Sequence, residues 1–347
     1  MNLGGWLVLE KWMTPSLFAG LAARDETSLC AELGRERAAQ RLRTHWDGFV
    51  SRDDFAWLAG IGIDSVRIPL GHWIFGPPYP YHASYGADPH PYVEGGIDVL
   101  DRALDQAAEH GLRVVLDLHA APGCQNGFDN GGIQDVCDWP TREEYLAHSV
   151  DVLGRLASRY RGHAALHAIE LLNEPRWDVP TELLTAWYLR AYDAVRAQCR
   201  AEDVAVIVHD GFRSHREYLG FLQPPRFENA ILDVHRYQCF DPADIALDLA
   251  GHVHKAGVLW RDEAETIQAE LGLPAIVGEW SLGLAPAATA ALAPAARDAA
   301  LRAYGAAQLE AFERYHGWFF WSYRTETMPA WSLRDSVERG WLPQRFD

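Results

Sequence analysis

Residues 168–175, AIELLNEP, decide how the rest of the sequence is interpreted. Apolar residues flank Glu170, as in a buried strand, and an Asn-Glu pair then stands directly before Pro175. Because proline has no backbone N–H to donate to a neighbouring strand, we expect strand pairing to stop there. The segment therefore predicts a buried strand that ends by presenting a carboxamide and a carboxylate, Asn173 and Glu174.

Similar short apolar segments recur along the chain and alternate with longer amphipathic segments. Eight segments have the composition of strands, counting a truncated one at the start: residues 2–5, 65–69, 113–119, 168–173, 204–209, 230–235, 275–279 and 317–321. Apolar residues at three-to-four spacing, typical of helices that cover a sheet, mark residues 97–110, 142–160, 182–200 and 297–315. Gly111 and Gly272 stand where two helices are expected to end. This repeated alternation predicts an α/β protein, a parallel (β/α)8 TIM barrel.

A doubly wound sheet is the rival architecture. It would need a glycine-rich phosphate-binding turn after the first strand, and residues 4–6, GGW, contain no GxGxxG pattern. Neither a Gly/Ser-rich linker nor a repeat divides the sequence, so we expect residues 1–347 to form a single catalytic domain. Residues 71–96 are rich in Pro and Tyr, and they predict an elongated loop after strand 2 of the barrel.

Composition excludes several classes of partner. The formal net charge of −17 argues against nucleic acid and anionic membranes, which bind clustered Lys and Arg. No run of 18 apolar residues occurs, so we expect no membrane insertion. As given, the sequence predicts a cytoplasmic protein, or a secreted or periplasmic one if the N-terminus is truncated. Five scattered cysteines without a CxxC pair predict free thiols, although a bridge between Cys124 and Cys137 is conceivable.

Polar side chains stand at the ends of nearly all the predicted strands. They are Arg67, His119, Asn173, Glu174, His209, Asp210, His235, Tyr237, Glu279 and Trp321. In a parallel barrel the carboxyl ends of the strands meet at one face, which is where barrel enzymes carry their chemistry. The pattern therefore predicts an active site at that face.

Two of these side chains are carboxylates, Glu174 and Glu279. Hydrolysis of a glycosidic bond needs one protonated carboxyl group for the leaving oxygen and one ionised group that attacks the anomeric carbon or activates water. Arg67 and Tyr237 are candidate hydrogen-bond donors to Glu279, and Asn173 is suited to hold the sugar 2-hydroxyl. Either glutamate alone would be explained by a structural salt bridge, whereas the two together favour catalysis.

The histidines have a simpler interpretation. A single histidine at a strand end, such as His209, is often a hydrogen-bonded core residue. His119 and His235 could serve as metal ligands on a barrel, but metal-dependent barrels of the amidohydrolase type need an HxH pair after the first strand, which here ends NLGGW. We therefore expect no metal, and neutral imidazoles that donate to sugar hydroxyls or to Glu279.

Several motifs together resemble one family. They are NLGGWLVLEKWMTPSLF, VRIPLGHWIF, DLHAAPGCQNGFDNGG, LLNEP, HRYQCF, VGEWS and GWFFWSYRTE followed by PAWS. In this order they closely resemble the exo-β-1,3-glucanase (glucan 1,3-β-glucosidase) branch of family 5 glycoside hydrolases, over nearly the whole chain. The resemblance implies a retaining (β/α)8 enzyme without cofactor, in which the carboxyl groups of the two catalytic glutamates lie ~5 Å apart. It implies that Glu174 is the acid/base and Glu279 the nucleophile that forms a glycosyl-enzyme.

The resemblance also implies supporting roles. Residues that match the lining of the −1 sugar site are Arg67, His119, Asn173, His235, Tyr237 and Trp321. Glu10, Asp129 and Asn130 match groups around the terminal glucose, and Phe128 and Phe240 match a phenylalanine pair that clamps the next sugar. The position of Phe128 between Gly127 and Asp129 independently favours stacking over core packing, while Phe240 fits packing and sugar contact equally well. A closed −1 pocket implies release of single glucose units.

Some features depart from the family pattern. The chain starts at the first motif, residues 76–90 form a longer loop than expected, and Arg236 stands where the family has a histidine. The loop could narrow the pocket or build a different aglycone site. Arg236 could be a surface charge or a new contact for a substrate group. The alternatives are therefore a β-glucosidase for another linkage or for glucosylated lipids or sterols, and a catalytically inactive carbohydrate-binding barrel. The expected partner is a β-glucan oligosaccharide or a small β-glucoside.

Overall fold

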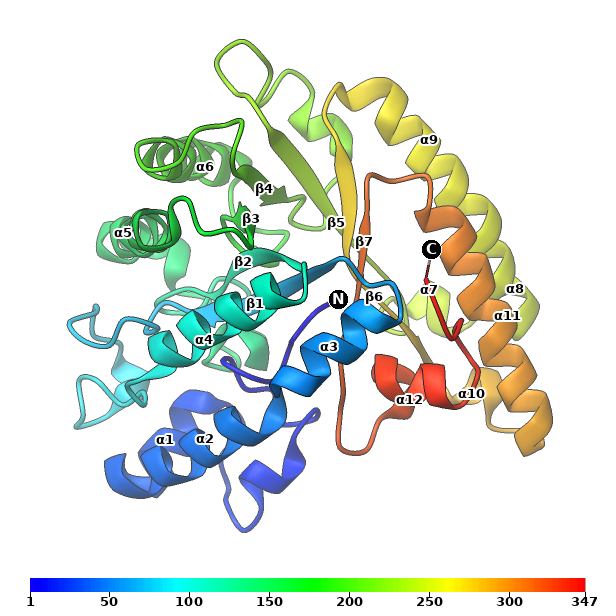
Figure 1. Ribbon diagram of the computed structural model, residues 1–347, viewed down its shortest axis with the longest axis horizontal. Helices are drawn as coiled ribbons and strands as arrows, with labels where there is room; N and C mark the ends of the chain where they lie inside the picture. Colours follow the sequence, from blue (N-terminus) through cyan, green and yellow to red (C-terminus); the bar gives the residue numbers. More distant parts are fainter. Residues whose placement is uncertain (347) are drawn as a thin grey trace. The chain divides into compact units, whose positions relative to one another are not determined.

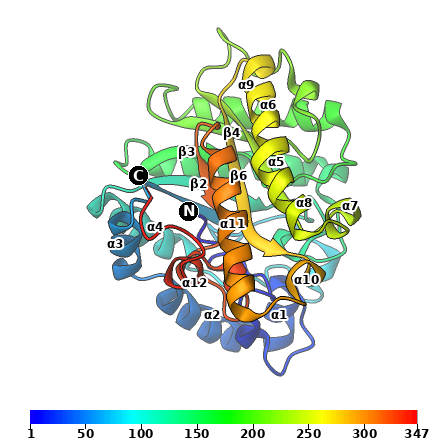
Figure 2. The same cartoon turned by 90° about the vertical axis from the view of Figure 1, so that its right-hand side faces the viewer.

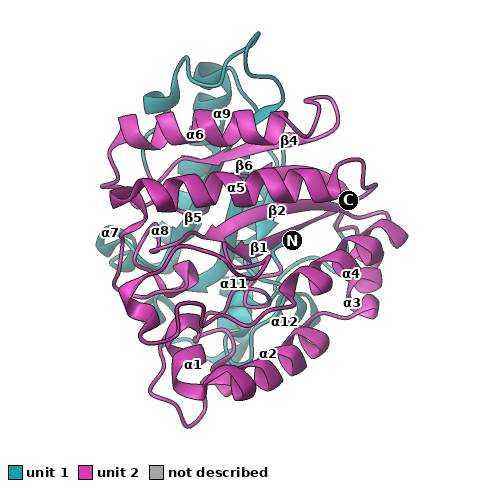
Figure 3. Cartoon of the chain, turned by 90° about the vertical axis from the view of Figure 1, so that its left-hand side faces the viewer, with its two compact units in different colours: residues 1–2, 213–347 teal, residues 3–212 magenta. Residues whose placement is uncertain are grey.

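The computed structural model describes residues 1–346, which divide into two compact units, coloured separately in Figure 3. Unit 2 comprises Leu3–Phe212, and unit 1 comprises Met1–Asn2 together with the chain from Arg213 onward. Each unit has its own run of parallel strands with helices. The single domain predicted from the sequence stays a prediction.

Unit 2 contains four parallel strands that pair in the order β1, β2, β3, β4. Its strands are β1 (Ser65–Gly71), β2 (Arg113–Ala120), β3 (Leu166–Glu170) and β4 (Ala205–His209). Arg67 pairs with Val115, Val115 with Ala168, and Ala168 with Ala205, so one row of residues crosses the whole sheet. Because these strands pair in parallel, their carboxyl ends lie along the same edge.

Six helices accompany these strands in the part of the chain coloured blue to green in Figure 1, where α5 and α6 lie to the left of β3 and β4. They are α1 (Glu26–Leu33), α2 (Arg35–Phe49), α3 (Arg52–Gly60), α4 (Gly96–Glu109), α5 (Glu143–Tyr160) and α6 (Thr181–Arg196). Short 3-10 turns span Pro15–Phe18, Ala83–Tyr85, Asp129–Gly131 and Trp139–Thr141. On α5 the buried residues Val152, Leu153 and Leu156 recur at three-to-four spacing, which gives the helix one apolar face for the core. Helices α5 and α6 pack against each other.

Unit 1 contains three parallel strands that pair in the order β5, β6, β7. Its strands are β5 (Ala230–Gln238), β6 (Ala275–Leu284) and β7 (Trp318–Phe320). Its helices are α7 (Pro242–Ile245), α8 (Leu249–His254), α9 (Trp260–Leu271), α10 (Pro286–Thr289), α11 (Pro294–Phe312) and α12 (Leu333–Glu338), with a π-helical turn at Lys255–Leu259 and 3-10 turns at His215–Tyr218 and Pro329–Trp331. Figure 2 shows α9 and α11 running side by side, and α11 also packs on β6.

Most predicted elements are present with shifted ends. The expected first strand at residues 2–5 is reduced to a single bridge residue, Asn2, whose backbone N–H donates to the carbonyl of Phe320 (3.1 Å). It cannot continue because a turn with Gly5 at φ +73° follows. The helix expected to reach residue 200 ends at Arg196. Gly111 and Gly272 adopt left-handed backbone after α4 and α9, as predicted. None of the helices within residues 1–346 is long and apolar enough to cross a membrane.

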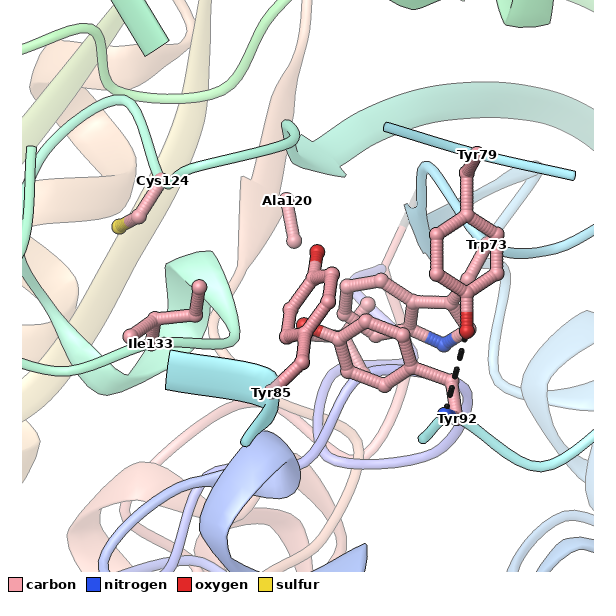
Figure 4. Close-up of a cluster of buried hydrophobic side chains, with 8 residues drawn as sticks. Trp73, Tyr79, Tyr85, Tyr92, Ala120, Cys124 and Ile133 are labelled. Atoms are coloured by element: carbon pink, nitrogen blue, oxygen red, sulfur yellow. Dashed lines mark hydrogen bonds between the residues drawn. The ribbon is translucent and has the colours of Figure 1, made fainter. Parts of the chain in front are cut away.

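The loop over residues 71–96 is packed into unit 2 around an aromatic cluster (Figure 4). We use the name aromatic cluster for the buried residues Val8, Trp73, Tyr79, Tyr85, Tyr92, Ala120, Cys124 and Ile133. The rings of Trp73 and Tyr92 stack at 3.7 Å, and Tyr92 also bonds Thr27 through its hydroxyl (2.6 Å). Three of the loop tyrosines are thus engaged in packing, while Tyr81 is exposed. The suggested role of residues 76–90 in narrowing the pocket or building an aglycone site stays a prediction.

Candidate active site

Glu174 lies four residues beyond the end of β3 and adopts unusual backbone geometry. Its φ is +43°, in the left-handed region that non-glycine residues seldom occupy. Its side chain is buried, and Oε2 accepts a hydrogen bond from Nδ2 of Asn130 (3.1 Å). Strained backbone of this kind persists where the surrounding structure fixes it, and it is concentrated at functional sites. The loop therefore holds this carboxyl group in a defined position.

A buried ionic network that joins β1, β2 and β3 positions Asn173. The guanidinium of Arg67 donates from Nε to Glu170 (2.6 Å) and lies 3.1 Å from the Asp117 carboxylate. It also donates to Oδ1 of Asn173 (2.8 Å). All three charged side chains are fully buried, so these contacts offset the cost of removing the charges from water. The proposed contact of Arg67 with Glu279 stays a prediction.

The same network determines which atoms of Asn173 and His119 donate. Because Oδ1 of Asn173 accepts from Arg67, its Nδ2 must face the other way, where it lies 3.4 Å from Nε2 of His119. Nδ1 of His119 is 2.6 Å from Asp117, which can only accept when ionised. The imidazole is thus held with its proton on Nδ1. Asp117 was not among the predicted site residues.

A buried glutamine joins the ends of two strands. Nε2 of Gln125 donates to the backbone carbonyls of His119 (2.7 Å) and Asn173 (2.9 Å), and its Oε1 accepts from the N–H of Ala121 (3.0 Å). All of its polar atoms are therefore used to hold the segment after β2 against the segment after β3. This positioning residue was also missed, because its partners are backbone groups that no motif identifies.

Two segments of unit 2 approach each other near the predicted sugar site. One contains Glu10, and the other contains Phe128 and Asp129. Glu10 is buried and accepts a hydrogen bond from the indole of Trp12 (2.9 Å). Burial raises the pKa of Asp129, and backbone N–H groups, including that of Lys11, oppose the rise. Phe128 is partly buried and directly precedes the 3-10 turn that begins at Asp129. The structure thus brings Asp129 beside the segment that contains Glu10.

A second buried glutamate, Glu26, supports the Glu10 segment from behind. Its Oε2 accepts a hydrogen bond from the N–H of Leu9 (3.0 Å). Burial raises the pKa of Glu26 to about 8, and the hydrogen bond from Leu9 counteracts this rise. We infer that Glu26 has a structural role, because its bond holds the backbone immediately before Glu10.

In unit 1, Glu279 lies on β6 beside the strand that carries His235 and Tyr237. The hydroxyl of Tyr237 donates to Oε2 of Glu279 (2.9 Å), which confirms one predicted donor. Nδ1 of His235 is 3.5 Å from the same oxygen, and its Nε2 is 3.4 Å from Asp233. His235 and Glu279 are direct partners in the β5–β6 register. The carboxylate is buried, and these polar groups replace part of the hydration that burial removes.

Gly278, the residue before Glu279, leaves room for this arrangement. A Cβ at this position would come within 1.8 Å of an oxygen of Asp233. The N–H of Gly278 donates to the other oxygen of Asp233 (2.5 Å). Asp233, like Asp117, precedes a site histidine by two residues, and such residues share a face of a strand. The repeated D-x-H pattern is the signal that would have identified both aspartates.

Trp321 is buried in unit 1, whereas Phe240 is 68% exposed. The Phe240 ring contacts Tyr237 edge-on (centroids 5.5 Å apart) and lies 6.1 Å from Trp331. Its exposure excludes core packing, so of the two interpretations of Phe240 the contact with a ligand is favoured. Trp331, which also lies 5.2 Å from the ring of Tyr237, was not predicted as a site residue although PAWS belongs to the motifs.

Arg236 forms an ion pair with α9. Its guanidinium donates to Glu263 (3.0 Å) and to the carbonyl of His235 (2.9 Å). It lines a cavity of about 420 Å³ in unit 1 together with His235, Tyr237, Lys255, Leu259, Trp260 and Glu263. With its charge balanced by Glu263, Arg236 has a role in fixing β5 to α9 and is not an isolated surface charge.

Trp177 and Phe212 in unit 2 form an exposed aromatic pair that sequence reasoning missed. Their exposed fractions are 59% and 43%, and the ring centroids lie 6.5 Å apart. Trp177 follows Glu174 closely in the chain, and Phe212 follows β4. His209, at the end of β4, is buried and accepts at Nδ1 from the N–H of Gly211 (2.8 Å), in agreement with the prediction of a hydrogen-bonded core residue.

The cysteines do not form a bridge. All five lie within residues 1–346 and are free thiols. Cys137 is close to Gln125, whose carbonyl accepts from its Sγ (3.3 Å). Burial raises the pKa of Cys124 to about 11. The conceivable bridge between Cys124 and Cys137 is absent, in agreement with the prediction of free thiols.

Comparison with known proteins identifies the class to which this geometry belongs. The family model described as "Cellulase (glycosyl hydrolase family 5)" matches residues 30–326. The chain therefore belongs to glycosyl hydrolase family 5 and is an O-glycosyl hydrolase, as the motifs predicted.

Individual relatives and a solved structure agree. The chain is 35% identical over 380 residues to a probable glucan 1,3-beta-glucosidase A of Aspergillus fumigatus, covering 99% of this chain and 86% of that protein. It is 33% identical over 383 residues to a glucan 1,3-beta-glucosidase of Blumeria graminis, covering 100% and 87%. The rutinosidase of Aspergillus niger is similar in structure, with a TM-score of 0.81, 18% identity, and coverage of 98% and 96%. The predicted (β/α)8 fold class is confirmed.

Proposed function

We propose that the protein is a retaining exo-β-glucosidase that releases glucose from β-1,3-glucan oligosaccharides or small β-glucosides. The observation that carries the proposal is that each of the two motif glutamates is buried and accepts a hydrogen bond at Oε2, with Glu279 within β6 and Glu174 four residues beyond β3. Tyr237 donates to Glu279 and Asn130 donates to Glu174. The names of the fungal relatives support β-1,3-linked glucose as the substrate.

In the first step, the ionised Glu279 attacks the anomeric carbon of the terminal glucose. The bond from this carbon to the glycosidic oxygen breaks, and Glu174 transfers its proton to that oxygen. The products are a glucosyl ester on Glu279 and the shortened sugar or free aglycone. The Tyr237 hydroxyl, which donates to Oε2 of Glu279, favours the ionised form of this carboxyl group.

In the second step, Glu174 is ionised and acts as a base. It takes a proton from water, the water oxygen attacks the anomeric carbon, and the ester bond to Glu279 breaks. Two inversions return the β configuration to the released glucose. Asn173, oriented by Arg67, is assigned to the sugar 2-hydroxyl, where contacts strengthen toward the transition state. Glu10, Asp129, His119, His235 and Trp321 are assigned to the remaining sugar contacts.

The exposed phenylalanine in unit 1 supports a sugar site beyond the terminal glucose. Phe240 offers an aromatic face to a ligand, and Phe128 is the proposed second wall of this site. A site that holds a single glucose and one further sugar would release one glucose per encounter.

The test is a product profile with laminaritriose, sophorose, cellobiose and gentiobiose as substrates. We expect laminaritriose to give glucose and laminaribiose first, with β-glucose as the initial anomer by proton NMR. Initial α-glucose would refute retention, and failure to cut any β-1,3 oligomer would refute the proposed substrate.

A β-glucosidase for apolar aglycones is the second candidate. The exposed pair Trp177 and Phe212 favours it, because Trp177 follows the proposed acid/base by three residues and exposed aromatic rings can contact an aryl or alkyl aglycone as well as a sugar. A higher kcat/KM for octyl β-glucoside than for laminaribiose, reversed by Trp177→Ala, would favour this candidate over the first.

A further inference from the structure

A series of side-chain hydrogen bonds in unit 2 ends at Glu174. It runs through the loop between β2 and α5, beginning at Asn126, which is almost fully buried. Nδ2 of Asn126 donates to Oδ1 of Asn130 (3.0 Å), and Nδ2 of Asn130 donates to Oε2 of Glu174 (3.1 Å). Asn126 itself does not contact Glu174, so any influence it has must pass through Asn130.

The direction of this series is set at Asn126 by a backbone group. The N–H of Phe128 donates to Oδ1 of Asn126 (2.9 Å), and a backbone N–H can only donate. The amide group of Asn126 must therefore turn Nδ2 toward Asn130, whose Oδ1 accepts. Asn130 in turn has only its Nδ2 left for Glu174. The orientation of both amides thus follows from one backbone donor.

This direction has a consequence for proton transfer. Oε2 of Glu174 is required as an acceptor, so a proton on the neutral carboxyl group is placed on Oε1. A general acid transfers a proton efficiently only when the proton faces the leaving oxygen. The amide series therefore selects the oxygen that delivers the proton.

The loop holds Asn126 rigidly. Sγ of Cys124 accepts from the N–H of Gly127 (3.2 Å) and donates to Oδ1 of Asn126 (3.4 Å). A Cβ on Gly131 would lie 2.2 Å from this sulfur, so the close packing depends on glycine. Cys124 and Ile133 belong to the aromatic cluster, and Figure 4 shows both to the left of the Tyr85 ring. The packed loop thus fixes the first member of the series.

We propose that Asn126 is a positioning residue that orients Asn130 and thereby determines which oxygen of Glu174 carries the transferable proton. The inference rests on the proposed role of Glu174 as acid/base. It assigns Asn126 an effect on proton delivery to the leaving group, distinct from sugar binding.

Asn126→Asp tests this with almost no change in shape. The new carboxylate still accepts from Phe128 but cannot donate to Asn130, so Asn130 turns its Nδ2 toward it and presents Oδ1 to Glu174. The proton then belongs on Oε2, directed away from the leaving group. The added negative charge favours the protonated form of Glu174, so a lower rate would not arise from a missing proton.

The measurement is kcat/KM with two substrates. Laminaribiose has a poor leaving group that needs the acid, whereas 2,4-dinitrophenyl β-glucoside does not. We expect Asn126→Asp to lower kcat/KM about 10- to 100-fold for laminaribiose, a part of the 10²–10⁴-fold that a general acid contributes. For the dinitrophenyl substrate we expect a change of less than about threefold. Asn126→Ala also removes the amide that donates to Asn130, so it should likewise lower kcat/KM more for laminaribiose than for the dinitrophenyl substrate. It replaces Asn126→Asp as the test if Asn126→Asp does not fold.

Ile133→Ala is the matched control, because it loosens the same loop without touching the amide series. It should lower the melting temperature and leave the ratio of the two kcat/KM values unchanged. An equal decrease for both substrates in both Asn126 variants would overturn the inference and indicate a structural role only.

Glu174→Gln separates this inference from the proposed function. If it lowers the rate selectively for laminaribiose and the Asn126 variants do not, only the inference fails. If Glu174→Gln shows no selectivity, the acid/base assignment itself fails.

Discussion

Tyr237→Phe removes one hydrogen bond to the proposed nucleophile. The Tyr237 hydroxyl donates to Oε2 of Glu279 at 2.9 Å, and both residues lie on neighbouring strands, β5 and β6. A hydrogen bond to a charged group contributes about 1.5–3 kcal/mol. At about 1.4 kcal/mol per factor of ten, its loss should lower kcat/KM about 10- to 150-fold.

The assay is the hydrolysis of 2,4-dinitrophenyl β-glucoside, whose kcat/KM reports attack by the nucleophile without acid assistance. Because Phe differs from Tyr only by the hydroxyl, the ring contacts of Tyr237 with Phe240 and Trp331 should persist. An unchanged melting temperature would show that the fold is intact.

Tyr304→Phe provides the matched control. Tyr304 is fully buried in α11, and its hydroxyl has no hydrogen-bond partner among residues 1–346. Its removal should leave kcat/KM within about twofold, because replacing an unsatisfied polar group with an apolar one is nearly neutral. A Tyr237→Phe variant as active as Tyr304→Phe would refute the role assigned to the Tyr237 hydroxyl.

Four further variants test other parts of the account. Glu279→Ala should abolish turnover, and azide should restore activity and give the α-glucosyl azide; undiminished hydrolysis would contradict the assignment. Glu174→Ala should lose about 10²–10⁴-fold in kcat/KM on laminaribiose but retain dinitrophenyl glucoside cleavage, and equal losses would exclude the acid role. Arg67→Met leaves two buried carboxylates without their cation and should lower the free energy of unfolding by about 3–5 kcal/mol in urea titrations. A decrease of less than about 1 kcal/mol would contradict the stabilising role of this buried network. Burial raises the pKa of Glu26 from 4.5 to about 8, so the folded state binds the proton more tightly than the unfolded state. The free energy of unfolding of the wild-type protein should therefore fall as the pH rises from about 4.5 to about 8. Glu26→Gln should remove this pH dependence, and an unchanged dependence would contradict the role of Glu26.

The sequence predicted the strands well because their signal is local. Runs of β-branched residues with a polar residue at the carboxyl end placed Arg67, His119 and Glu279 on β1, β2 and β6. Strand ends were less accurate: β3 ends at Glu170, because the chain turns to reach the left-handed conformation of Glu174. Conformations imposed by packing from elsewhere in the fold leave little trace in a local pattern.

The supporting groups of the site were harder to predict, for two different reasons. Asp117 and Asp233 had a detectable signal, since each precedes a site histidine by two residues on the same strand face. Gln125 and Asn126 stand in the motif DLHAAPGCQNGFDNGG, but the motif does not indicate which groups they contact. Their roles depend on backbone groups and loop packing that form only after folding, and polar residues in a loop have many alternative explanations.

The central claim is that Glu279 forms a covalent bond to glucose during turnover. Incubation with 2,4-dinitrophenyl 2-deoxy-2-fluoro-β-glucoside, which slows hydrolysis of the intermediate, should inactivate the enzyme and add one fluoroglucosyl group to the protein by mass spectrometry. Peptide mapping should place this group on Glu279. Labelling of another residue, or inactivation without any covalent addition, would contradict the account.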